Sequence, residues 1–184
     1  MDPFETLSNE HSLIRQYLDN LTLAADDIQN GGQPPGVFFE KAVVFARIFA
    51  DEFHHFKEEH LLFVRLAQKR RGELDARLGV LRQQHERGRE LVTGIATAIE
   101  GYTAGDPGAT GALVERLGAF TSLLRHHLHM EDHVVYPIAR RELDAADLRE
   151  LDTEYLKIQA KYGGDTFERA QSLVVDMGSI LADM

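Results

Sequence analysis

The chain has 184 residues, with 30 acidic side chains against 20 basic ones and a formal net charge of −10. This charge opposes binding to nucleic acids and to anionic lipid surfaces, and the absence of cysteine excludes disulfides, thiolate metal sites and cysteine nucleophiles. No stretch approaches the roughly 18 consecutive apolar residues of a membrane span, and the N-terminus lacks a signal-peptide pattern. We therefore expect a cytoplasmic protein that binds neither nucleic acid nor membranes.

The start of the chain predicts an amphipathic helix over residues 3–30. Apolar residues recur there with the period of one helix face, at Leu7, Ile14, Leu18 and Leu21. His11 lies in the same stripe. Asp2 suits an N-cap before Pro3, and the glycines and prolines between residues 31 and 36 predict the first loop.

Two further helices are predicted over residues 37–71 and 73–102, bounded by glycines at 36 and 72 and by the turn at 103–108. The inner face of the second helix runs through Val43, Ala46, Ala50, His54, Glu58 and Leu61. The inner face of the third runs through Leu74, Leu78, Leu81, His85, Gly88, Val92 and Ile95. Each of these apolar stripes is therefore interrupted by a histidine.

A fourth helix follows the turn at residues 103–108, and Pro137 lies near its end, where a proline can kink a helix. Its stripe is unbroken through Leu113, Leu117, Phe120, Leu124, His127, Glu131, Val134 and Ile138. Strand signals are missing throughout. Four amphipathic helices with short connections predict an all-α fold, an antiparallel up-and-down four-helix bundle, because short loops make sequential helices run in opposite directions.

Residues 1–142 are thus predicted to form the bundle, and residues 143–184 a C-terminal helical extension. Two helices are expected in the extension, over residues 145–162 and 166–181, separated by Gly163 and Gly164. Their apolar stripe predicts packing either on the bundle or at a contact in a homodimer. The sequence pattern leaves this choice open.

One short motif occurs twice on the predicted bundle helices. The segments are His54-His55-Phe56-Lys57-Glu58-Glu59-His60 and His127-Leu128-His129-Met130-Glu131-Asp132-His133, and both read H-x-x-x-E-[ED]-H. Residues four apart stand on the same face of a helix. The first histidine and the glutamate of each copy can therefore reach one metal ion.

Four imidazoles and two carboxylates are predicted to face the interior of the bundle: His11, His54, Glu58, His85, His127 and Glu131. Unpaired polar groups cost several kcal/mol to bury, and shared cations remove that cost. Histidine and carboxylate ligands suit iron, manganese or zinc. We therefore predict that these six residues are metal ligands.

Other registers have the same spacing, since His55 with Glu59 and His129 with His133 are also four residues apart. The alignment of the two motif copies favours His54 with Glu58. The remaining histidines are then expected on the surface or behind the ligands: His55, His60, His126, His129 and His133. Glu59 and Asp132 are expected to accept hydrogen bonds from ligand imidazoles.

The combination of His11, His54-x-x-x-Glu58, His85 and His127-x-x-x-Glu131 resembles the hemerythrin-like, or HHE cation-binding, domain family over about residues 5–142. The resemblance implies two iron ions bridged by an oxo or hydroxo group and by the two glutamates. The four histidines would complete the coordination.

Two departures from oxygen-carrying hemerythrins bear on function. Those proteins have a second third-helix histidine four residues from the first, where this chain has Leu81 and Arg89 beside His85. Their last carboxylate follows its histidine by five residues, a spacing that selects Asp132 over Glu131 here. With one imidazole fewer, a coordination position is expected to be open or filled by water, which argues against simple reversible oxygen carriage.

The predicted function is that of a non-haem di-iron protein that binds or reduces a small ligand, either O₂, NO or peroxide, in sensing, detoxification or iron handling. An electron donor would be a further partner. The alternatives are an iron-donating or metal-buffering protein for the repair of iron centres, and a regulatory module with a zinc or mononuclear site. Zinc or manganese could also substitute for the iron. No residue is identified as a general acid or nucleophile, so enzymatic turnover is left open.

Overall fold

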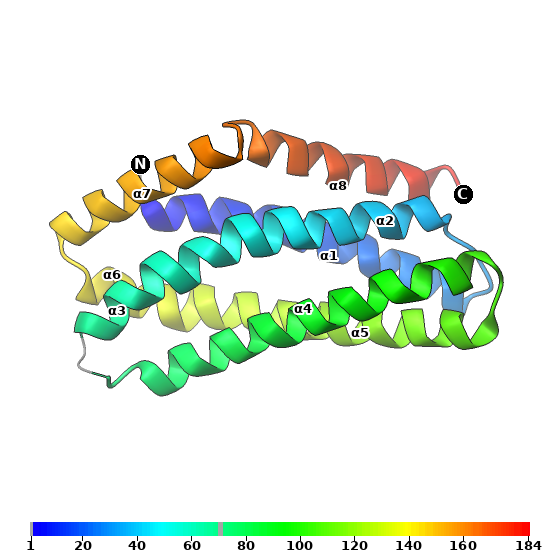
Figure 1. Cartoon of the computed structure of the whole chain (residues 1–184), viewed down its shortest axis with the longest axis horizontal. Coiled ribbons are helices and arrows are strands. Elements are labelled where there is room, and N and C mark those ends of the chain that lie inside the picture. The colour runs from blue at the N-terminus through cyan, green and yellow to red at the C-terminus, as the bar shows by residue number, and fades with distance from the viewer. Residues whose placement is uncertain (1, 70–71) are drawn as a thin grey trace.

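The computed structural model describes residues 2–69 and 72–184, and the regular elements in these ranges are all helical (Figure 1). Four long helices form the bundle: α1 (Pro3–Gln29); α2 (Gly36–Val44) continued by η1 (Phe45–His55), η2 (Glu58–Leu62) and α3 (Phe63–Lys69); α4 (Asp75–Thr103); and α5 (Pro107–Met130) continued by η3 (Glu131–Val135) and α6 (Tyr136–Glu142). Successive helices run antiparallel, so the predicted fold class is confirmed. No described helix is long and apolar enough to cross a bilayer.

The helix starts follow the capping signals in the sequence. The Asp2 carboxylate accepts a hydrogen bond from the backbone N–H of Phe4 at 3.0 Å, and Asp106 accepts one from Gly108 at 2.8 Å. A proline occupies the first turn after each of these caps, where its missing N–H costs nothing. The predicted end of the second helix at residue 71 lies outside the described residues.

The segments that carry the H-x-x-x-E motif are not regular α-helix. The π-helical elements η1, η2 and η3 cover the first motif histidine and both motif glutamates. In a π-helix the hydrogen bonds reach one residue further than in an α-helix, so side chains shift from the faces that α-helical periodicity assigns to them. Such bulges are rare and occur frequently at functional sites.

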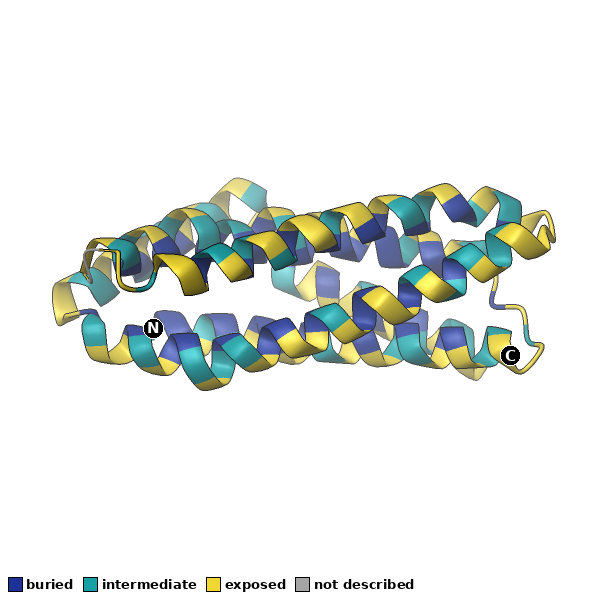
Figure 2. Ribbon diagram, turned by 90° about the horizontal axis from the view of Figure 1, so that it is seen from below, coloured by how far each residue is buried: buried dark blue, intermediate teal, exposed yellow. Residues whose placement is uncertain are grey.

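The apolar core is divided into two clusters along the bundle. One includes Tyr17, Phe45 and Phe49, and the other includes Phe4 and Phe63 near the opposite end. Buried residues face the interior along every long helix (Figure 2). The buried histidines and glutamates lie between the two apolar clusters, where side-chain packing excludes bulk water.

The C-terminal extension consists of α7 (Ala145–Tyr162) and α8 (Thr166–Ala182), separated by Gly163 and Gly164, whose positive φ angles suit glycine. It packs on the first half of the bundle: Met177 is buried in the core, and the side-chain amide of Asn20 donates to the carbonyl of Val174 at 2.9 Å. Packing on the bundle is therefore observed. A homodimer contact and the domain boundary at residue 142 stay predictions.

Candidate metal centre

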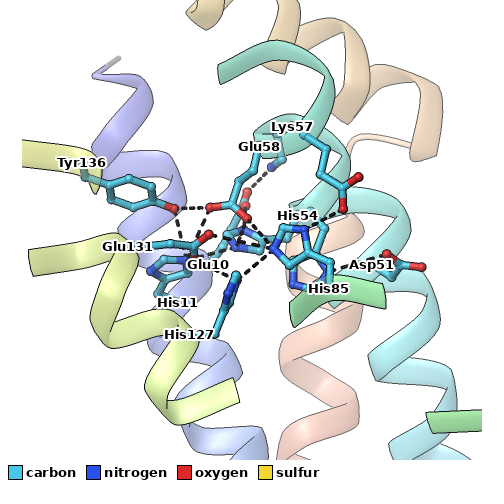
Figure 3. A network of polar contacts seen from close by, with 12 residues as sticks. Glu10, His11, Asp51, His54, Lys57, Glu58, His85, His127, Glu131 and Tyr136 are labelled. Atoms are coloured by element: carbon cyan, nitrogen blue, oxygen red, sulfur yellow. Dashed lines mark hydrogen bonds and ion pairs between the residues drawn. The ribbon is translucent and has the colours of Figure 1, made fainter. Parts of the chain in front are cut away.

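The six predicted ligand residues lie together in one buried layer of the bundle (Figure 3). Each has no exposed surface, and they come from all four long helices: His11 on α1, His54 on η1, Glu58 on η2, His85 on α4, His127 on α5 and Glu131 on η3. The predicted convergence of these side chains is therefore observed.

The four imidazoles meet in two pairs through their Nε2 atoms. Nε2 of His11 lies 3.0 Å from Nε2 of His54, and Nε2 of His85 lies 2.9 Å from Nε2 of His127. A neutral imidazole that donates through Nδ1 has only a lone pair at Nε2. The Nε2 atoms of a pair present opposed lone pairs if both Nδ1 atoms carry the ring protons. If one Nε2 atom carries a proton instead, the contact is a hydrogen bond.

Every one of these Nδ1 atoms faces an oxygen acceptor. Nδ1 of His11 donates to Asp132 at 2.9 Å and Nδ1 of His85 donates to Glu59 at 2.6 Å. The roles predicted for Glu59 and Asp132 are thus confirmed. Two acceptors were missed by the sequence reasoning: Glu10, 2.8 Å from Nδ1 of His54, and Gln84, 2.9 Å from Nδ1 of His127. Carboxylates accept but do not donate, so Nδ1 of His11, His54 and His85 carries a proton, and in their neutral form these rings turn an Nε2 lone pair toward the space between the histidines, which suits metal coordination.

The two glutamates complete this arrangement. Oε2 of Glu58 lies 3.6 Å from Nε2 of both His54 and His85. Oε2 of Glu131 lies 3.1 Å from Nε2 of His127 and 3.4 Å from Nε2 of His11. Oε2 of Glu58 and both carboxylate oxygens of Glu131 are buried without a hydrogen-bond partner. Because a buried carboxylate without a partner is costly, the residues present fit a bound cation.

His55 is a fifth buried imidazole, so the expectation of a surface position is wrong, and a position behind the ligands stays a prediction. It is 5% exposed and its ring stacks on that of His85, with the ring centroids 3.8 Å apart. The π-helical turn of η1 explains this position, because it lets the neighbouring residues His54 and His55 both face inward. The other non-ligand histidines are exposed as expected: His60, His126, His129 and His133.

The buried ligand atoms form two groups with metal-binding geometry. One group contains His11, His54, Glu58 and Glu131, and the other contains His55, Glu58, His85 and His127. Within each group the ligand atoms lie within 4.8 Å of one another. Glu58 belongs to both groups, so its carboxylate lies within reach of both candidate metal positions.

Burial sets the protonation of several of these groups. It lowers the pKa of His55 to about 3 and also lowers the pKa values of His54 and His85. Burial acts in the same direction on His11, but its contacts with Asp132 and Glu131 together outweigh burial and raise the pKa. Most of the imidazoles in the centre are therefore neutral near pH 7, the form that binds metals.

Tyr136 is a further polar group in the centre that sequence reasoning did not assign. Its hydroxyl donates to Oε1 of Glu58 at 2.6 Å and lies 3.1 Å from Nε2 of His11 (Figure 3). Burial raises the pKa of this phenol well above its usual range, so the hydroxyl keeps its proton. The sequence contains a signal for this residue. When the two motif copies are superimposed, the hydroxyl-bearing Tyr136 takes the place of Phe63.

An apolar cavity of about 230 Å³ adjoins the His55 side of the centre. Its walls include Ala46, Ala50 and Gly88, whose small side chains leave the space, and it extends to His55 and His85. A small uncharged molecule can pass through such a cavity without losing strong hydrogen bonds to water. At its edge, Arg89 forms ion pairs of 2.7 Å with Asp51 and 2.9 Å with Glu59.

Comparison with known proteins agrees with this geometry. The family described as the hemerythrin HHE cation binding domain matches residues 2–139. The chain is also similar to the uncharacterized proteins Rv1995 of Mycobacterium tuberculosis (strain ATCC 25618 / H37Rv) and Mb2018 of Mycobacterium bovis, with 27% identity over 174 residues in each case. These alignments cover 94% of this chain and 68% of each relative. No solved structure gives a significant match.

Proposed function

The chain belongs to the hemerythrin HHE cation-binding domain family, and from this premise we propose that it holds two iron ions and binds or reduces a small ligand, O₂, NO or peroxide. One ion would be held by His11, His54 and Glu131, and the other by His55, His85 and His127. Glu58 would bridge them. Sensing, detoxification and iron handling are the roles that such a centre supports.

The observation that carries the proposal is the set of opposed lone pairs in the buried layer. Two Nε2 pairs face each other at 3.0 and 2.9 Å, and the Nδ1 atoms of His11, His54 and His85 donate their protons to carboxylates. Unpartnered oxygens of Glu58 and Glu131 face the same space. Two cations would relieve both the lone-pair repulsion and the unpaired negative charge.

Iron is favoured because the donor set consists of imidazoles and carboxylates only and because the chain belongs to this family. Bound iron would supply the electrons for binding and reducing the small ligand. His55 would provide the imidazole that the third helix lacks, since Leu81 and Arg89 stand beside His85.

The protein side chains would control access and protonation. The apolar cavity beside His55 and His85 would admit a small uncharged ligand such as O₂ or NO. The hydroxyl of Tyr136 would hold the carboxylate of Glu58 in position through its hydrogen bond and would keep a neutral phenol on the His11 side of the centre. The two apolar clusters would keep bulk water out.

Metal analysis and absorption spectroscopy of protein produced with ample iron test this proposal. We expect two irons per chain and the near-ultraviolet bands of an oxo-bridged pair. His54→Ala and Glu131→Ala should each abolish stoichiometric metal binding, whereas His126→Ala, at an exposed position on the same helix as His127, should bind as the wild type does. Equal metal in all three variants would refute the ligand assignment.

The same preparations separate the proposal from its alternatives. Retention of iron during incubation with a chelator, together with a spectral change on adding NO, supports a ligand-binding centre. Rapid loss of iron to the chelator or to a metal-free acceptor protein would instead favour an iron-donating protein. Stoichiometric zinc in protein from iron-rich cells would contradict the di-iron assignment.

A further inference from the structure

A second, larger pocket lies outside the metal centre, between the bundle and the C-terminal helices. Its volume is about 570 Å³, within the range of roughly 300–1,000 Å³ typical of small-molecule sites. Its walls come from α1, the η1 segment, α7 and α8. It therefore exists only because the C-terminal extension packs on this half of the bundle.

The walls of this pocket combine an apolar surface with a buried ion pair. Phe53 and Phe167 contribute aromatic rings, and Leu156, which is 58% exposed, lies at the opening. Lys57 and Glu10 also line the pocket and form an ion pair, although both side chains are almost completely buried. A buried pair of this kind destabilises the fold unless its remaining polar atoms are satisfied, and so it points to a functional role.

Two further features indicate the chemistry of the occupant. The lining of the pocket includes the carboxylates of Glu10 and Glu168 and one cation, Lys57, which is paired with Glu10. The lining therefore has a net negative charge and disfavours anions. In addition, Tyr155 lines the pocket and its buried hydroxyl has no hydrogen-bond partner, a polar atom whose burial is otherwise uncompensated.

The base of the pocket is connected to the metal centre. Glu10 contacts Lys57 through Oε1 and accepts the hydrogen bond from Nδ1 of His54 through Oε2 at 2.8 Å (Figure 3). A molecule that changes the position or charge environment of Lys57 therefore acts on the group that orients His54. The pocket and the nearest proposed iron ligand are separated by this one carboxylate.

We propose that this pocket is a binding site for a small organic molecule with a flat apolar body and no negative charge, and that its occupancy alters the metal centre through Glu10 and His54. The flat body packs between Phe53, Phe167 and Leu156. The second part of the proposal rests on the proposed function, whereas binding itself does not.

Two fluorescent probes test the binding. Thioflavin T is planar and cationic, and 8-anilinonaphthalene-1-sulfonate is similarly apolar but anionic. With metal-free protein, we expect saturable thioflavin T binding at one site per chain, at least tenfold tighter than binding of the sulfonate. Absence of saturation, or tighter binding of the sulfonate, would overturn the proposal. Because no iron is needed, this outcome is independent of the proposed function.

A matched pair of substitutions locates the binding site. Leu156→Arg places a cation at the opening of the pocket and should weaken thioflavin T binding at least tenfold. Leu23→Arg is the control, because Leu23 is 57% exposed but lies outside the pocket. Both positions are on helix surfaces, so the fold should tolerate both changes. An equal effect of the two substitutions would show that the dye binds elsewhere.

The connection to the metal centre is tested on iron-loaded protein. Saturating thioflavin T should change the rate of iron release to a chelator by at least threefold in the wild type, and much less in Leu156→Arg at the same dye concentration. An unchanged rate of iron release while the dye is bound would overturn the proposed effect of the pocket on the metal centre. It would not contradict binding of the dye in the pocket. A protein that binds the dye but never binds iron would refute the proposed function alone.

Discussion

The two halves of the bundle place equivalent residues in the same contacts. His11 and Arg15 on α1 correspond to His85 and Arg89 on α4, and the sequence separations between the paired histidines are 43 and 42 residues. In both halves the residue before the first histidine accepts from the Nδ1 atom of the second: Glu10 from His54, and Gln84 from His127. Likewise, the acid after each motif glutamate, Glu59 or Asp132, serves a histidine of the other half.

Four differences between the halves lie at or beside the buried layer of this shared frame. His55 in the first half corresponds to Leu128 in the second, and Tyr136 in the second corresponds to Phe63 in the first. The buried Glu10 and Lys57 pair corresponds to Gln84 and Met130. The comparison teaches that a symmetric frame surrounds two unequal candidate metal positions, one with the additional imidazole of His55 and one beside the phenol of Tyr136. Substitutions that replace a residue of one half by its counterpart in the other half test whether the two candidate metal positions differ.

Removal of the residue common to both metal groups should have the largest effect. Glu58→Ala should reduce bound iron from two ions per chain to nearly none, because Glu58 is the carboxylate that both groups share. Metal analysis after removal of free iron gives the result. Glu90→Ala, at an exposed position on α4, is the control. Binding of two irons by Glu58→Ala would show that Glu58 does not bridge.

Replacement of His55 should affect one metal position only. His55→Leu makes the first half resemble the second, and we expect one iron to remain while the affinity for the other falls at least tenfold. The affinity change would be measured by iron titration under anaerobic conditions. His129→Leu, on the exposed surface, should leave both affinities unchanged. A wild-type titration of His55→Leu would remove His55 from the ligand set.

Acid should destabilise the metal-free protein. The pKa of His55 is lowered to about 3 and those of His54 and His85 are also lowered, so the unfolded chain binds protons below about pH 6.5 that the folded chain does not. Stability is then full above pH 6.5 and is lost as the pH falls, by about 1.4 kcal/mol per pH unit for each proton. The pKa values of His11, Glu10 and Glu58 are raised, so these three groups act in the opposite direction, and the contribution of one lowered group is measured as the difference between the wild type and His55→Leu.

Urea unfolding between pH 7 and pH 5 measures this dependence. His55→Leu should reduce the slope of the free energy of unfolding against pH by the equivalent of up to one bound proton. It removes one of the three imidazoles whose pKa is lowered. The same pH dependence in His55→Leu as in the wild type would contradict the buried, neutral state of His55.

Replacement of Tyr136 should have the smallest effect on the fold. Tyr136→Phe makes the second half resemble the first, and loss of its hydrogen bond to Glu58 should cost about 1 kcal/mol of stability. Two irons should still bind, while reduction of O₂ should slow by a few-fold, because the phenol no longer positions the carboxylate that both metal groups share. Stopped-flow spectroscopy measures this rate. An unchanged rate would limit Tyr136 to a structural role.

Much of the fold and of the candidate site follows from sequence periodicity. The apolar stripes, the Asp-Pro caps and the Gly/Pro turns predict the four helices, and the repeated motif predicts that His54, Glu58, His127 and Glu131 face inward. His11 and His85 follow because each interrupts an apolar stripe. Packing of the C-terminal helices on the first half was one of two alternatives that the pattern allowed.

The features that sequence reasoning missed depend on interactions between helices or on irregular backbone. His55 is off the inner face of an α-helix and becomes internal only in the π-helical turn of η1. Glu10 and Gln84 are ordinary polar neighbours of histidines until their helices pack and bring His54 and His127 within hydrogen-bonding distance. The burial of Lys57 depends on the helices that cover it.

The most direct test of the central claim is the number of iron ions bound per chain, measured by elemental analysis on protein whose concentration is known from amino-acid analysis. The account predicts two ions in the wild type and one in His55→Leu. A single iron in the wild type, or none, would contradict the claim that the buried histidines and glutamates hold a pair of metal ions.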